Sequence, residues 1–450
     1  MFKTLKNAWK TPELQKKMLF TLFIVLLYRL GACIYVPYVS SEISSSFSAA
    51  YGSSVLGLMS ILSGGAMQYA TLFALSVSPY ITASIVMQLL TIAIPPLERM
   101  AKDGANGQKK INVITRYVTV ALALITSFGY SMLLKNNGWL VSSVGAEGGT
   151  PEWFAMLVIN AAFCAGAALV MWLAELINEK GIGNGISIIL FANIIASIPG
   201  LVRTLVTNIT SGAVAWWVGA LVAVGVVIVA IAMVGFVVFI TNSERRIPIQ
   251  YAKRVVGRKM YGGQNTNLPI KLNMSGVMPI IFASSIVSIP ATITAFMSNR
   301  ENWFYKFVEN FFSPTTWEYL VVFLILIVAF SYFYILISFN PVEVANNITA
   351  NGGMIPGLRS GRPTVQYIQR ILKRITFIGA IFLCIVAGLP MLVTVITTAI
   401  ESAHPGSVKV DLSMLTFGGS SLLIVVGVAL ETVRDLEAQL SLRNNKGFLG

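Results

Sequence analysis

Residues 55–94, VLGLMSILSGGAMQYATLFALSVSPYITASIVMQLLTIAI, decide the fold of this chain. The first part, 55–71, is moderately apolar but too short and too rich in Gly and Ser to span a bilayer, which takes about 20 apolar residues. The second part, 72–94, is long enough, contains Pro79 and stops before a Pro-Pro pair. A short half-helix joined directly to a spanning helix has to lie at membrane depth, covered by protein or lining a cavity. Broken helices of this kind mark substrate routes in transporters and channels, and the alternative is an amphipathic segment on the outer membrane interface.

The composition extends the membrane interpretation to the whole chain. Of its 450 residues, 56% are hydrophobic and only 11% are charged, which leaves too little polar surface to cover a water-soluble globule. The sequence therefore predicts an all-α polytopic membrane protein. Ten runs are long enough to cross a bilayer, and they are 18–38, 72–94, 113–134, 153–174, 184–202, 213–241, 275–297, 319–339, 375–399 and 413–432.

The distribution of positive charge predicts the orientation of these spans. The chain has 32 Lys and Arg residues and a formal net charge of +14. Twenty-six of the 32 fall in the two termini and in alternate loops, whereas five fall in the opposite loops. Since cytoplasmic loops carry an excess of Lys and Arg, we expect both termini to lie in the cytosol. We also expect the first span to be retained rather than cleaved as a signal peptide, because Arg29 interrupts its apolar run.

The predicted spans hold few groups that could do chemistry. They contain no histidine and no acidic residue at mid-membrane, so a membrane protease, a haem or zinc site and a proton- or sodium-coupled carrier each lack an essential group. The three cysteines lie far apart and no P-loop motif is present, so we predict no metal, no cofactor and no enzyme activity. Arg29 is the clear intramembrane charge, and we expect it to bond backbone carbonyls within the bundle. This pattern favours a conduit with an apolar lining, which blocks ions by dewetting.

Three connecting segments carry further signals. The glycine-rich run GIGNG at 181–185 predicts a tight turn that lets two helices approach closely, rather than a phosphate loop. Residues 242–272 alternate apolar and polar side chains before a Gly-Gly pair and predict an extended ribbon that folds back. Residues 340–374 contain a series of turn signals. The last two segments are basic and longer than a hairpin needs, so we expect them to dock a large acidic partner such as ribosomal RNA; the alternative is that their charge only sets topology.

Several motifs, in order along nearly the whole chain, resemble those of the SecY family, the central subunits of bacterial Sec protein-conducting channels. They are Ser63-Gly64-Gly65-Ala66, Pro79-Tyr80-Ile81, Ser84-Ile85, Gly104 and Gly107 before Lys110-Ile111, Thr115-Arg116-Tyr117, GIGNGISII from Gly181, Tyr251-Ala252-Lys253-Arg254, LNMSGVMPIIFASS from Leu272, Phe339-Asn340-Pro341 and Ile355-Pro356-Gly357-Leu358-Arg359.

The resemblance implies two pseudo-symmetric, inverted halves of five helices, 1–205 and 206–450, that close around an hourglass pore. The half-helix at 55–71 would be a re-entrant plug, centred on Ile61, Leu62, Ser63, Gly64, Gly65 and Ala66. A ring of aliphatic side chains would form the constriction, and it falls on Val77, Ile81, Ile186, Leu190, Ile281 and Ile424. A lateral gate would open between spans two and three and spans seven and eight, with Thr82, Ser285 and Ile289 as lining. The basic positions expected to dock partners are Arg246, Arg254, Arg258 and Arg359.

The resemblance also implies a function and a set of partners. The chain would be a passive channel in the bacterial plasma membrane that translocates unfolded secretory polypeptides and releases transmembrane segments sideways into lipid. Its partners would be the small membrane subunits SecE and SecG, the motor SecA, the ribosome, and preproteins with their signal sequences. The rival interpretation is a secondary transporter of a small solute with inverted repeats, which would need a polar midplane site that this sequence does not offer.

Overall fold

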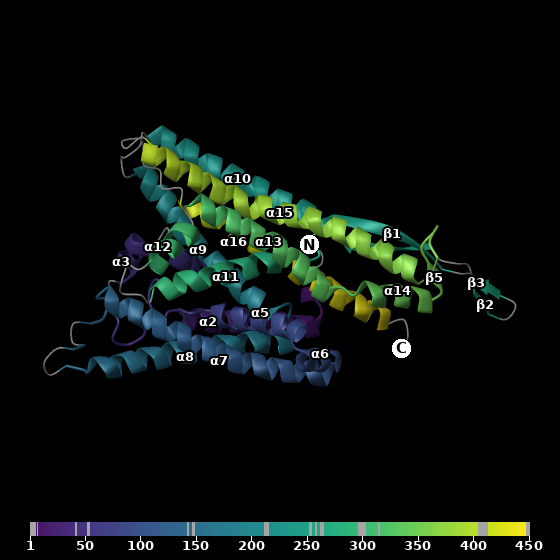
Figure 1. Ribbon diagram of the computed structural model, residues 1–450, viewed down its shortest axis with the longest axis horizontal. Coiled ribbons are helices and arrows are strands. Elements are labelled where there is room, and N and C mark those ends of the chain that lie inside the picture. Colours follow the sequence, from purple (N-terminus) through teal and green to yellow (C-terminus); the bar gives the residue numbers. More distant parts are fainter. Residues whose placement is uncertain are drawn as a thin grey trace.

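The computed structural model describes residues 6–446 apart from 7, 41–42, 52–54, 142–143, 146–148, 211–215, 252–253, 257–258, 262–264, 296–302, 314–315, 360 and 404–412. The described chain is an elongated bundle of helices with short strands at one end (Figure 1). The long helices run roughly along the length of the bundle, with α7 and α8 along one side and α10 and α15 along the other. The end of α16 lies toward the same end as the strands, as expected if this end faces the cytosol.

Each of the ten predicted spans coincides with a helix. These helices are α2 (Pro12–Gly31), α5 (Ser78–Ala93), α7 (Ala105–Asn136), α8 (Glu152–Lys180), α9 (Gly185–Thr210), α10 (Trp216–Asn242), α11 (Met278–Ala295), α13 (Trp317–Ser338), α15 (Arg362–Ala403) and α16 (Ser413–Lys446). The all-α polytopic prediction is confirmed. Many apolar side chains on these helices stay exposed in the isolated chain, as a protein solvated by lipid requires.

Length and composition alone single out fewer of these helices. In the described part of the chain, four are long and apolar enough to cross a membrane, with bounds Asn106–Asn136, Glu152–Lys180, Trp317–Ala350 and Arg362–Thr397. A fifth span results if α5 is counted with α6 (Pro95–Lys102), from which it is bent by 101°. The bend lies at Ile94, directly before the Pro-Pro pair, because proline disfavours a helical conformation in the residue that precedes it.

Short helices complete the bundle. They are α3 (Ile43–Tyr51), α4 (Val55–Leu62), α12 (Trp303–Phe312) and α14 (Pro341–Ala350). The half-helix predicted for 55–71 is shorter in the structure, since α4 ends at Leu62 and the chain then turns until Ser78. The prediction that 72–94 is helical throughout is therefore wrong for its first six residues. Pro79 consequently lies in the first turn of α5, where its missing N–H breaks no helical hydrogen bond.

The ribbon predicted for 242–272 is confirmed. Strand β1 (Glu244–Tyr251) pairs antiparallel with β4 (Asn265–Lys271) so that Ile247 lies opposite Leu268. The other edge of β1 pairs with β5 (Gly353–Met354), and β2 (Arg254–Val256) forms a separate hairpin with β3 (Lys259–Tyr261). Buried apolar side chains of β1, α14 and the start of α15 form one cluster, so the two basic segments make a small folded unit.

The segment 340–374 is more helical than its turn signals suggest. It contains α14, and α15 already begins at Arg362, thirteen residues before the predicted start of that span. The helix therefore extends beyond the apolar run at its N-terminal end. Asn340 supplies the N-cap of α14, since its side-chain oxygen accepts a hydrogen bond from the N–H of Val342 at 3.1 Å.

The turn predicted at 181–185 is confirmed in its structural role. Gly183 has a φ of 72°, which residues with a side chain rarely adopt. A Cβ on Gly185 would lie 2.0 Å from the carbonyl oxygen of Ala174, so only glycine allows α8 and α9 to approach this closely.

Candidate pore constriction and plug

One cavity lies where the predicted ring and the predicted plug meet. It has a volume of about 70 Å³, and none of the side chains that line it is charged. Four of the six predicted ring residues form part of its wall, each from a different helix: Ile81 of α5, Leu190 of α9, Ile281 of α11 and Ile424 of α16. All four are buried, so the structure gathers aliphatic side chains from distant parts of the sequence around one point.

The other two predicted ring residues belong to the same apolar cluster but do not line the cavity. Val77 is buried and immediately precedes α5. Ile186 is half-buried in the first turn of α9, four residues before Leu190 and hence on the same face of that helix. The cavity thus supports the four-residue core of the predicted ring, and the complete ring stays a prediction.

The predicted plug forms one wall of this cavity. Leu56, Met59 and Leu62 of α4 line it together with Ser63, the first residue after the helix. Ile61, on the next face of α4, is half-buried. The segment therefore lies against the constriction, inside the protein, which favours the re-entrant arrangement over a helix on the outer membrane interface.

The glycines of the plug permit the sharp turn that ends α4. Gly64 and Gly65 have φ values of 67° and 85°, and the N–H of Gly65 donates to the carbonyl of Ser60 at 2.8 Å. The hydroxyl of Ser63 accepts a hydrogen bond from the N–H of Met67 at 3.1 Å. Ala66 is 2% exposed, so the chain turns directly back into the bundle.

Of the three residues predicted to line a lateral gate, one lines the cavity and two do not. Helix α11 packs against both α5 and α7, so the two sides of the predicted gate are in contact. Ser285 of α11 lines the cavity and donates to the carbonyl of Ile281 at 2.8 Å. Thr82 of α5 is half-buried and donates to the carbonyl of Ser78 at 3.1 Å, while Ile289 is 43% exposed, and neither lines the cavity.

Sequence reasoning missed the contribution of α7 to the cavity. Thr126 and Tyr130 both line it, and the Tyr130 hydroxyl donates to the backbone carbonyl of Met67 in the predicted plug segment. Ser284 of α11 also lines the cavity, next to Ser285. The sequence feature that could have indicated Thr126 and Tyr130 is their four-residue spacing, which places both side chains on one face of the third predicted span.

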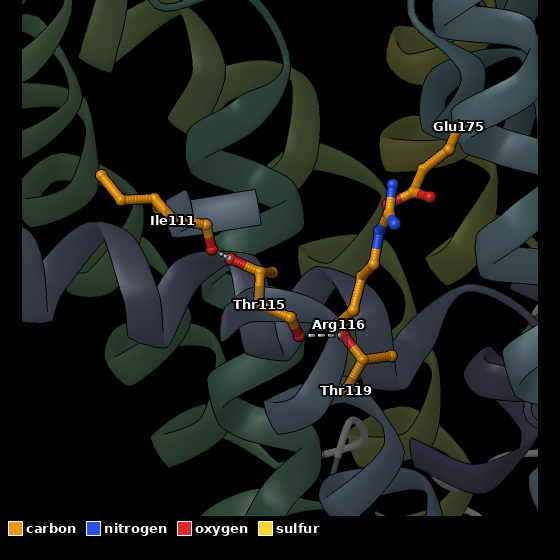
Figure 2. Close-up of polar contacts among 5 residues, drawn as sticks. All are labelled: Ile111, Thr115, Arg116, Thr119 and Glu175. Atoms are coloured by element: carbon orange, nitrogen blue, oxygen red, sulfur yellow. Dashed lines mark hydrogen bonds and ion pairs between the residues drawn. The ribbon is translucent and has the colours of Figure 1, made fainter. Parts of the chain in front are cut away.

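An ion pair joins two helices of the N-terminal half. Nε of Arg116 on α7 lies 2.8 Å from Oε1 of Glu175 on α8 (Figure 2). Next to Arg116, Thr115 donates to the carbonyl of Ile111 at 2.9 Å and Thr119 donates to that of Thr115 at 2.7 Å, so these hydroxyls are satisfied within α7. The Thr-Arg-Tyr motif thus packs α7 against α8 and lies outside the cavity.

Three of the four basic positions predicted to dock partners lie on or next to the small folded unit. Arg246 is exposed on β1 and pairs with Glu244 at 2.7 Å, and Arg254 begins β2. Arg359 is exposed three residues before α15. Arg258 lies outside the described residues.

A polytopic helical bundle whose interior holds an uncharged cavity, lined by aliphatic side chains and by a short helix with the turn after it, is typical of a channel-type membrane protein. The SecY family model matches residues 71–433, and the chain belongs to the SecY family. A protein translocase subunit SecY of Streptomyces griseus is 42% identical over all of both chains. The SecY subunit of Corynebacterium glutamicum is 39% identical, over 98% of this chain and 99% of its own length.

Solved structures show the same fold. A structure described as that of a protein-conducting channel is similar over 94% of this chain and 92% of its own, with a TM-score of 0.58 and 16% identity. A SecY structure concerned with the plug domain and the closed state has a TM-score of 0.61 over the same shares, also at 16% identity. Sec61 in a canine ribosome–channel complex has a TM-score of 0.55 and covers 94% of this chain. The comparisons support a translocation channel and not a small-solute transporter.

Proposed function

We propose that this chain is the channel subunit of a bacterial protein translocase, which passes unfolded secretory polypeptides across the plasma membrane and releases transmembrane segments into lipid. The observation that carries the proposal is the single cavity shared by Ile81, Leu190, Ile281, Ile424 and the plug segment. Membership of the SecY family supports it independently.

The predicted constriction would accept any polypeptide sequence because its four aliphatic side chains carry no polar or charged group. Its four aliphatic side chains offer no hydrogen bond or charge that would favour one substrate residue over another. A narrow apolar constriction also excludes hydrated ions by dewetting, so the resting channel stays sealed. The plug against this constriction adds a second barrier.

The contact between α11 and the α5–α7 pair would be the lateral gate. A segment in the pore could leave through it if lipid solvates the segment better than water does. A leucine at the centre of a membrane helix is favourable by about 0.5 kcal/mol, whereas a central Asp or Arg costs about 3 kcal/mol. A run of apolar residues would therefore partition sideways, and a secreted polar chain would continue forward.

Energy for translocation would come from outside this subunit. The motor SecA or a translating ribosome would dock on the unit formed by β1, β4, β5 and α14 and on the β2–β3 hairpin, where Arg246, Arg254 and Arg359 supply positive charge. Phosphate contacts by Arg are a general source of affinity for RNA. The small subunits SecE and SecG would complete the membrane complex. The excess of Lys and Arg in alternate loops supports cytosolic termini.

Reconstitution tests the function directly. Vesicles holding this chain with SecE and SecG of the same cell would receive SecA, ATP and a radiolabelled preprotein, and protected preprotein would be measured after protease treatment. We expect ATP-dependent protection that requires both the chain and an intact signal sequence. Protection no greater than in vesicles without this chain would contradict the proposal.

A second measurement separates the channel from the rival transporter. In the same vesicles a stalled preprotein should crosslink to a photoreactive residue placed at Ile81 or Ile424. Saturable uptake of a small solute, with no such crosslink, would favour the transporter instead.

A further inference from the structure

A buried polar cluster contacts the plug where α4 ends. Its members come from three parts of the N-terminal half: Tyr28 and Arg29 of α2, Ser76 just before α5, and Asn193 and Ser197 of α9. Asn193 and Tyr28 have no exposed surface, and Ser76 is 6% exposed. Polar groups at such depth are expensive unless they are bonded, so their partners indicate what the cluster does.

Two of these side chains cap the plug helix. The amide Nδ2 of Asn193 donates to the carbonyl of Leu62 at 2.8 Å. The single hydroxyl proton of Ser197 is shared between the carbonyl of Ile61 at 3.3 Å and the carbonyl of Asn193 in its own helix at 3.2 Å. The last four carbonyls of an α-helix have no partner within the helix. Helix α9 therefore supplies, from more than a hundred residues away, hydrogen bonds that the end of α4 needs.

Arg29 closes the cluster from the other side. Its guanidinium donates to the carbonyl of Ala192, which confirms the expected backbone partner. A Cβ on Gly64 would lie 2.7 Å from Nη1 of Arg29 and 3.1 Å from Oδ1 of Asn193, so both side chains pack onto the bare backbone of the plug turn. A positive charge near the C-terminus of α4 also favours the helix dipole.

The hydrogen bonds of Asn193 depend on the position of the plug. Its amide also donates to the hydroxyl of Ser76 at 3.1 Å, and that hydroxyl lies 3.3 Å from the hydroxyl of Tyr28. Oδ1 of Asn193 is buried and has no hydrogen-bond partner among the described residues. If the plug leaves, the amide also loses the Leu62 carbonyl, and a buried donor without a partner is costly.

We propose that Asn193, assisted by Ser197, is a specificity-determining clasp that sets how readily the plug leaves and hence how strong a signal sequence must be to open the channel. The proposal rests on the proposed function and deepens it. The clasp joins the plug to α2 and α9, so it makes the plug part of the N-terminal half in the resting state.

The test compares Asn193→Ala, Ser197→Ala and the double variant with the wild type, each in the complete channel complex. The loss of the Leu62 hydrogen bond should raise ion leakage across planar bilayers roughly three- to tenfold for Asn193→Ala, and about twofold for Ser197→Ala with its longer bond. Export of a preprotein with a weakened signal sequence should rise in the same order. The matched control is Asn160→Ala on α8. Its amide nitrogen bonds the Met156 carbonyl of its own helix at 2.9 Å and its oxygen accepts from Ser131 of α7 at 3.3 Å, but neither bond touches the plug, so the variant should change neither quantity.

Deleting residues 60–67 makes the test specific for the plug. In that background Asn193→Ala should have no further effect, because the clasp has nothing to hold. The clasp would be overturned if Asn193→Ala raised ion leakage as much in the channel lacking residues 60–67 as in the complete channel. It would also be overturned if both single variants leaked no more than the wild type. Export by the wild-type channel in the same vesicles tests the proposed function separately. If the wild type exported no preprotein, the proposed function itself would be contradicted, whereas the leakage of the variants tests only the clasp.

Discussion

The backbone N–H of Gly183 donates a hydrogen bond to Oδ2 of Asp435 at 3.0 Å, which joins the turn between α8 and α9 to the C-terminal part of α16. Two further bonds lie beside it: Nζ of Lys17 donates to the side chain of Gln439 at 3.2 Å, and the N–H of Ile182 donates to the hydroxyl of Thr21 at 3.1 Å. The two predicted halves of the chain are thus tied together at the end opposite the plug.

Asp435→Ala should loosen this tie. A hydrogen bond to a charged group contributes about 1.5–3 kcal/mol, and partial exposure of Asp435 places the expected loss at the lower end. The measurement is thermal unfolding of the purified complex in detergent. Asp435→Asn keeps one oxygen as acceptor and should lose less, and equal losses in the two variants would contradict the role of the carboxylate.

Replacing Ile81 and Ile424 with Asn should open the constriction to water. Each change puts a polar amide into the apolar wall of the cavity, so dewetting no longer blocks ions. We expect a severalfold increase in ion conductance across planar bilayers and less stringent selection of signal sequences. Leu157→Asn on α8 is the control, because that side chain is 56% exposed and lies outside the cavity. An unchanged leak in the Ile81 and Ile424 variants would argue against the seal.

Gly64→Ala should displace the plug more than Gly65→Ala does. Both residues have positive φ, so both substitutions carry backbone strain of about 1 kcal/mol. Only at Gly64 would the new Cβ collide with the guanidinium of Arg29, whereas at Gly65 it meets nothing closer than Tyr69 at 3.8 Å. The rate of disulfide formation between a cysteine in the plug and one in a translocating chain would report the difference. Identical rates for the two variants would show that the contact with Arg29 does not hold the turn.

Arg359→Glu should impair SecA-dependent export without lowering the amount of channel in the membrane. The residue is exposed beside the small folded unit, so reversing its charge would repel an acidic partner with little effect on packing. Export in reconstituted vesicles and an immunoblot of the membrane fraction are the measurements. Arg99→Glu on α6 is a charge reversal elsewhere on the predicted cytosolic side and should have a smaller effect. Normal export by the Arg359 variant would exclude that residue as a docking contact.

Hydropathy was sufficient to locate the helices, because each spanning segment must bury its own backbone and carry apolar side chains over its whole length. It did not locate their ends. The start of α5 at Ser78 depends on the turn that the plug makes before it, and the early start of α15 depends on its packing against β1 and α14.

The sequence likewise predicted some residues of the candidate site and not others. Family motifs pointed to Ile81, Leu190, Ile281 and Ile424, and the structure places these four in one cavity. The bond from Asn193 to Leu62 was not predictable, since nothing local in either segment indicates that two residues 131 positions apart become partners. Thr126 and Tyr130 carried a helical spacing, but their place at the cavity depends on how α7 packs against α5 and α11.

Helix α15 has a mechanical consequence. Its 42 residues correspond to roughly 60 Å, about twice the hydrocarbon thickness of a bilayer. It begins three residues after Arg359, beside the strands at one end of the bundle, and reaches through the bundle to α10, α13 and α16. A push delivered at that end by a bound motor or ribosome would travel along one continuous helix from Arg362 as far as Pro390, the proline inside α15, without first crossing a joint between separate elements.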